Sequence, residues 1–176
     1  MGALLLSSSL MNDKVLTDFE QTTNEFVSTL SSFSEDDFNT KPADGGWSAA
    51  QVGQHMNLRH KMGELLNGTV EDVDRDSALN IPQIKKDMLN FEIKMQSPEL
   101  VRPEDKKYDK AQLTSSLNAK MEDTKEAIKT LDLGKACTDF VLPNSVPFTR
   151  LEWVYFIVYH TQRHTHQLQK LRQKIA

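Results

Sequence analysis

Apolar residues recur at helical intervals in four segments of the chain, and no competing strand-like alternation is evident. The expected helices run from about Asp13 to Phe33, from Ser48 onward, from Asp109 onward, and from Thr149 nearly to the C-terminus. Their apolar stripes are formed by Val15, Phe19, Phe26, Leu30 and Phe33; by Val52, Met56, Met62, Leu65 and Leu66; by Leu113, Leu117, Met121, Ile128 and Leu131; and by Leu151, Trp153, Ile157, Leu168 and Leu171. Since each stripe covers one helix face, the pattern predicts an all-α fold.

The last three helices begin with the same arrangement of residues. A capping residue is followed three positions later by Gln or Glu, at Ser48–Gln51, Asp109–Gln112 and Thr149–Glu152. The two side chains of such a pair can satisfy N–H groups that a helix start leaves unpaired. An aromatic residue precedes each cap and can pack back onto its helix, at Trp47, Tyr108 and Phe148. Gly134 is expected just past the end of the third helix.

The stretch between Gly68 and Tyr108 breaks this regularity. Prolines prevent one continuous helix there, at Pro82, Pro98 and Pro103. A short helix is expected near 83–90, and we interpret the stretch as a long crossover between the second and third helices. Residues 137–148 are expected to form a loop into the last helix. The predicted architecture is a four-helix bundle over residues 1–176, a single domain with residues 1–11 as a frayed N-terminus.

Composition and charge narrow the class of protein. The 176 residues are 38% hydrophobic and 26% charged, which suits one domain with a buried core. A net charge of −4 provides no basic field for nucleic acid or an anionic membrane surface. The chain contains no run of about 18 apolar residues, so no transmembrane helix is predicted. Because Cys137 is the single cysteine and cannot form an internal disulfide, a cytoplasmic location is expected.

The histidines are the strongest candidates for chemistry. His160 and His164 are four residues apart, so they share a helix face, and this spacing lets two imidazoles bind one metal ion. They continue the apolar stripe of the last helix. His55 lies three residues past Val52, on the inward face of the second helix. His60 and His166 point elsewhere and are expected at the surface.

Two interpretations of the inward histidines stay open at this point. A single buried histidine is commonly a core residue with a hydrogen-bond partner. Two imidazoles at i and i+4, with a third on another helix, favour a shared metal ion because buried polar groups are costly to satisfy separately. Periodicity alone does not show that the second and fourth helices touch.

Several motifs resemble those of the DinB/YfiT-like superfamily. The opening motif is Gly45-Gly46-Trp47-Ser48, with His55 eight residues after the Trp. The closing motif runs from Leu151-Glu152-Trp153 through His160-Thr161-Gln162-Arg163-His164 to Gln167-Leu168. Ser97-Pro98-Glu99 and Pro103, followed by a long helix, are similar to the usual connection between the two. The resemblance covers nearly the whole chain in order.

The resemblance implies a four-helix bundle with a divalent metal ion held by three histidines. His55 matches the ligand on the second helix, and His160 and His164 match the pair on the last helix. Zn²⁺ or Ni²⁺ is the expected ion, with Fe²⁺ or Mn²⁺ as alternatives. Many relatives of this kind form homodimers, so the resemblance implies a homodimer. Some are thiol S-transferases that use bacillithiol, mycothiol or glutathione, one group isomerises maleylpyruvate, and many are described as metal-dependent hydrolases without a known substrate.

The leading hypothesis is therefore a metal-dependent thiol S-transferase or hydrolase acting on a small molecule, with a low-molecular-weight thiol as a candidate cosubstrate. No general base stands out. Arg59, four residues after His55, is a candidate for binding a substrate carboxylate, although an exposed surface role is preferred. The alternatives are a non-catalytic metal-binding bundle and a helical interaction module whose three core histidines are satisfied without metal.

Overall fold

The chain is mainly helical in its computed structural model, which describes residues 2–59, 62–143 and 145–175. The all-α class is thereby confirmed. The elements are α1 Gly2–Ser31, α2 Glu35–Phe38, α3 Ala49–Arg59, α4 Met62–Leu66, β1 Val70–Glu71, α5 Ile81–Met88, the 3₁₀ helix η1 Glu99–Val101, α6 Lys110–Thr130, β2 Ala136–Cys137 and α7 Arg150–Ile175. No described helix is long and apolar enough to span a bilayer.

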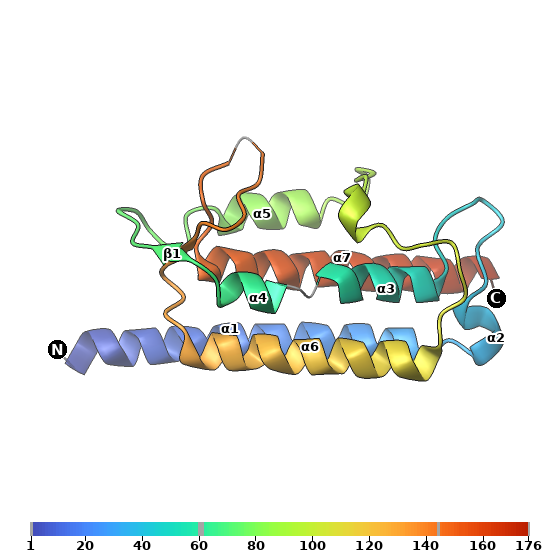
Figure 1. Ribbon diagram of the computed structural model, residues 1–176, viewed down its shortest axis with the longest axis horizontal. Helices are drawn as coiled ribbons and strands as arrows, with labels where there is room; N and C mark the ends of the chain where they lie inside the picture. Colours follow the sequence, from blue (N-terminus) through green and yellow to red (C-terminus); the bar gives the residue numbers. More distant parts are fainter. Residues whose placement is uncertain (1, 60–61, 144, 176) are drawn as a thin grey trace.

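The long helices lie side by side along the longest axis of the molecule (Figure 1). Helix α1 contacts both α6 and α7, and α3 contacts the same two helices. Helix α4 packs on α6, and the short helix predicted near 83–90 is α5, which packs on α7. The second and last helical segments therefore touch, which periodicity alone could not establish.

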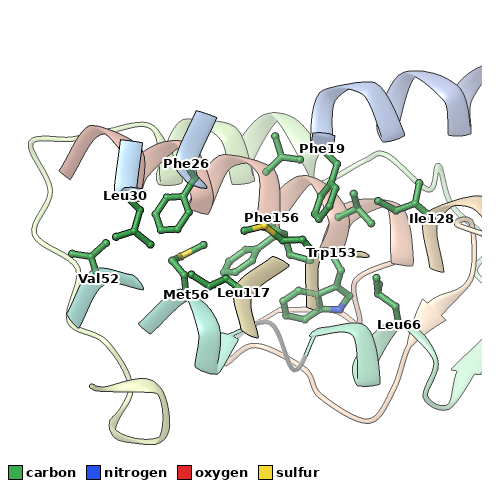
Figure 2. Close-up of a cluster of buried hydrophobic side chains, with 14 of the residues drawn as sticks. Phe19, Phe26, Leu30, Val52, Met56, Leu66, Leu117, Ile128, Trp153 and Phe156 are labelled. Carbon is green, nitrogen blue, oxygen red and sulfur yellow. The ribbon is translucent and has the colours of Figure 1, made fainter. Parts of the chain in front are cut away.

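The predicted apolar stripes meet in one core (Figure 2). Its largest buried side chains include Phe19, Phe26 and Leu30 of α1, Met56 of α3, Leu117 and Ile128 of α6, and Trp153 of α7. Gly53 lets α3 approach closely, because a Cβ there would lie 3.0 Å from a methyl of Leu30 and 3.1 Å from one of Leu113. Met62 was also predicted in the stripe of the second helical segment, but its side chain lies outside the described residues.

The predicted helix starts are confirmed by their hydrogen bonds. Ser48 Oγ accepts from the Gln51 N–H at 3.2 Å, and the Ser48 N–H donates to Gln51 Oε1 at 3.1 Å. Thr149 and Glu152 make the same reciprocal pair at 3.1 and 2.9 Å. At the third start, Asp109 accepts from the Gln112 N–H at 2.7 Å. The two helices that carry the histidines thus have reciprocally capped first turns.

Three boundaries differ from the prediction. Helix α1 begins at Gly2 rather than near Asp13. Helix α6 ends at Thr130, short of Gly134, because the chain turns so that Leu133 is buried and its carbonyl accepts from the Leu151 N–H at 2.9 Å. The expected loop from residue 137 includes the end of β2, which pairs antiparallel with β1. Strands of two residues are too short to produce an alternating pattern.

Candidate metal centre

The three histidines predicted to converge lie together in the interior. His55 comes from α3, and His160 and His164 come from successive turns of α7. The Nε2 atom of His160 lies 3.4 Å from Nε2 of His55 and 3.0 Å from Nε2 of His164. Their possible ligand atoms all lie within 4.8 Å of one another. His55 is 1% exposed and the other two are 7% exposed, so this three-histidine group is largely closed to water.

The outer nitrogens of two of the rings are oriented by hydrogen bonds. His55 Nδ1 lies 2.7 Å from the main-chain oxygen of Val101, and His164 Nδ1 lies 2.8 Å from Oε1 of Gln167. A carbonyl oxygen only accepts, so each Nδ1 carries the proton and donates it. In the neutral rings, the lone pairs of His55 and His164 are then on Nε2, facing the centre of the group.

This arrangement of donor atoms suits a divalent ion. Imidazole nitrogens bind such ions at about 2.0–2.1 Å, so nitrogens that share one ion stand about 3.0–3.4 Å apart. The two Nε2–Nε2 separations, 3.0 and 3.4 Å, fall at the limits of this range. Among the described residues, no Asp, Glu or Cys joins the group. The three-histidine group could therefore hold a divalent ion without cancelling any of its charge.

Aromatic side chains surround the group. The ring of Trp47 lies 5.1 Å from that of His55. Phe156 stacks on His160, with ring centres 5.8 Å apart and planes 9° from parallel. Phe156 is in turn in edge contact with Trp153, which is part of the core as predicted. A shell of this kind excludes water and strengthens electrostatic interactions inside it.

The crossover between α5 and α6 passes over the ligand-bearing helices (Figure 1). Arg163 donates from Nη1 to the carbonyls of Met88 and Asn90, at 3.0 and 2.8 Å, and from Nη2 to that of Ile93. Burial lowers the pKa of Arg163 below its ordinary value. Further along the crossover, the Val101 carbonyl meets His55. The crossover therefore contacts both of the helices that carry the three-histidine group.

Among the described residues, the other candidates are not part of the group. His166 was predicted at the surface, but it is half-buried because Phe91 stacks on it, with ring centres 4.1 Å apart. Cys137 is buried in β2, and its burial raises the pKa of its thiol to about 11. Glu152 caps α7 as predicted. The side chain of Arg59 and the whole of His60 lie outside the described residues.

Three residues around the group have roles that sequence reasoning missed. Gln167 is three residues after His164, so helical spacing could have placed the two side chains on one face. Val101 acts through its main-chain carbonyl, for which no side-chain signature exists. Arg163 lies inside the closing motif, but its partners are carbonyls 70 to 75 residues away in the chain. Only the first of these interactions is local enough to be read from spacing.

Comparison with known proteins is consistent with this geometry. A family model described as the DinB superfamily matches residues 18–168, a span that includes all three histidines and the crossover. No curated protein matches the chain, and no solved structure matches it.

Proposed function

The chain belongs to the DinB superfamily, and on that premise we propose that it is a metal-dependent enzyme acting on a small molecule. His55, His160 and His164 hold one divalent ion, Zn²⁺ or Ni²⁺ in the first instance and Fe²⁺ or Mn²⁺ as alternatives. The observation that carries the proposal is the convergence of three buried imidazoles from two helices, with ligand atoms within 4.8 Å of one another.

The reaction class follows from the chemistry of the donor set. A divalent ion held by three neutral imidazoles supplies Lewis acidity at an open position, which makes a thiol or a water molecule more acidic. The residues of the chain contribute orientation and exclusion of water. Val101 and Gln167 hold two rings with Nε2 inward, and Trp47 and Phe156 cover two of the rings. Thiol S-transfer and hydrolysis both fit this site, and the identity of the bound nucleophile decides between them.

We also infer that the architecture is the four-helix bundle of the DinB type. The four helices of the bundle are α1, the α3–α4 segment, α6 and α7. The stretch from β1 to η1 is the long crossover between the second and third of these helices. The contacts of α1 and α3 with both α6 and α7 support this arrangement.

Metal analysis of untagged protein tests the proposal. Wild-type protein is expected to contain about one equivalent of a divalent ion per chain, and His55→Ala is expected to lose it because two ligands bind far more weakly than three. Cys137→Ala is the control, since it removes a potential metal ligand that lies outside the group. Wild-type protein that takes up none of Zn²⁺, Ni²⁺, Fe²⁺ and Mn²⁺, even when each is supplied in excess, refutes the proposal.

Catalysis is tested separately by a thiol-consumption assay on the metal-loaded protein. Glutathione, bacillithiol and mycothiol are each paired with a model electrophile, and hydrolysis of model esters and amides is followed in parallel. Turnover that disappears in His160→Ala supports an enzyme. Metal-dependent melting without turnover in any assay supports the alternative, a bundle whose metal only stabilises the fold.

A further inference from the structure

Residues 89–104 are the part of the long crossover that follows α5, and the crossover below means these residues. They are attached to the rest of the molecule at two places, one on each ligand-bearing helix. At the α7 end, Arg163 binds the carbonyls of Asn90 and Ile93, together with that of Met88 just before the crossover, and Phe91 stacks on His166. At the α3 end, Val101 O meets His55 Nδ1, and Gln51 Nε2 donates to Glu104 O at 3.4 Å.

The part of the crossover between these attachments is poorly anchored. Most of its side chains are exposed, and Leu100, directly before Val101, is 93% exposed. Apart from the short η1 it has no regular structure between Leu89 and the start of α6. A segment with few buried contacts has a low free energy of local opening. The position of the Val101 carbonyl therefore depends on the attachments at both ends.

His55 is the ligand most dependent on this carbonyl. His160 and His164 sit on one helix, and their spacing is set by the helix itself. His55 alone comes from α3, and its Nδ1–H is donated to the crossover 46 residues further along the chain. Partners of this kind fix the ring orientation of metal-binding histidines, and their loss typically lowers metal affinity about 10–100-fold.

We propose that Arg163 is a positioning residue of the metal site: by tying the crossover to α7 it holds the Val101 carbonyl against His55, and so sets the affinity for the ion. The inference rests on the proposed function. It extends the site beyond its ligands to a guanidinium that lies outside the three-histidine group. By thermodynamic linkage, metal binding in turn stabilises the crossover.

The test compares Arg163→Met with Arg172→Met. Arg172 is also on α7 and also donates to a main-chain carbonyl, that of Thr29 at 3.2 Å, but its partner belongs to α1. Two quantities are measured for each protein: the Zn²⁺ dissociation constant, by competition with a chromophoric chelator, and hydrogen exchange of residues 89–104 with and without Zn²⁺. Arg163→Lys is included because it keeps the charge and stem and serves with the same readouts if the Met variant does not fold.

Arg163→Met is expected to raise the dissociation constant about 10–100-fold and to speed exchange in residues 89–104. Arg172→Met is expected to leave both within about twofold, and Zn²⁺ is expected to slow exchange of the crossover in wild-type protein. Faster exchange with unchanged affinity refutes the positioning role. Unchanged exchange refutes the anchoring of the crossover by Arg163. This comparison can also be made with metal-free protein. Wild-type protein that binds none of Zn²⁺, Ni²⁺, Fe²⁺ and Mn²⁺ refutes the proposed function instead, and this outcome is distinguishable from both.

Discussion

Helix α7 contributes to two buried polar clusters, the Glu152 cluster at its first turn and, further along, the three-histidine group that it forms with His55 of α3. In the Glu152 cluster, Arg75 donates to both carboxylate oxygens at 2.8 Å. The N–H groups of Thr149 and Asn80 also donate to these oxygens, each at 2.9 Å. The carboxylate therefore has a complementary donor in every contact. Glu152 is fully buried, yet nothing about it requires an external partner.

The three-histidine group is buried to a similar degree but is composed of like groups. Two of its rings donate outward to Val101 and Gln167, and their remaining lone pairs face inward toward the ring of His160. A cation is the complement that such an arrangement suits. Burial of polar side chains therefore does not distinguish a structural site from a functional one. The chemical match between neighbours does, and the two clusters on α7 can be separated experimentally on that basis.

The largest expected effect is on folding, from Glu152→Ala. The change leaves the Arg75 guanidinium and two N–H groups without their acceptor, and removal of one partner of a buried pair costs about 3–5 kcal/mol. Since Arg75 is 19% exposed, we expect about 3 kcal/mol, measured by urea unfolding of metal-free protein. The Zn²⁺ dissociation constant of the folded variant is expected to stay within twofold of wild type. A large loss of metal affinity would contradict the separation of the two clusters.

The same pair predicts an acid dependence. Burial raises the pKa of Glu152. The hydrogen bonds from Arg75 and from the N–H groups of Thr149 and Asn80 lower the pKa by a larger amount, so the net pKa lies below the ordinary value of 4.5. A carboxyl whose pKa is lowered on folding contributes stability above its unfolded pKa and loses it as pH falls through the folded pKa. The stability difference between wild type and Glu152→Gln is therefore expected to be constant near neutral pH and to shrink below about pH 4.5.

The two clusters also differ in how far the sequence revealed them. Glu152 was predicted as a cap because its partner Thr149 is three residues away, a spacing that helix geometry fixes. Arg75 was not predicted, since a side chain 77 residues distant leaves no local pattern. The inward direction of the three histidines followed from the apolar stripes. Their convergence required the contact between α3 and α7, which the family resemblance suggested and the structure provides.

The parts of the fold that the sequence missed have a common cause. The β1–β2 pair and the early end of α6 are set by main-chain hydrogen bonds between distant segments, such as Leu151 N–H to Leu133 O. The crossover is positioned in the same way, through the Val101 carbonyl and the carbonyls that Arg163 binds. Main-chain groups are the same at every residue except proline, so interactions that use them leave no side-chain pattern in the sequence.

An effect of intermediate size is expected from the metal. An ion that binds only the folded state stabilises it by about 2.7 kcal/mol at a free concentration 100 times its dissociation constant. For a domain of this size, that corresponds to a rise in Tm of about 5–10 °C. Wild-type protein and Glu152→Ala are both expected to show this increment with Zn²⁺, and His164→Ala is not. An equal increment in His164→Ala would place the bound ion elsewhere on the protein.

The smallest expected effect is that of Cys137→Ala, which bears on the source of the thiol in the proposed transfer. Cys137 is fully buried, and because burial raises the pKa of its thiol to about 11, only about one molecule in a thousand carries the reactive thiolate at pH 8. The folded protein is therefore expected to resist alkylation by iodoacetamide, and the urea-unfolded protein to react readily. Cys137→Ala is expected to keep the Zn²⁺ content and any thiol-consuming activity of wild type. Loss of that activity in a folded, metal-loaded variant would make Cys137 a participant, whereas its retention would mean that the nucleophilic sulfur comes from the cosubstrate.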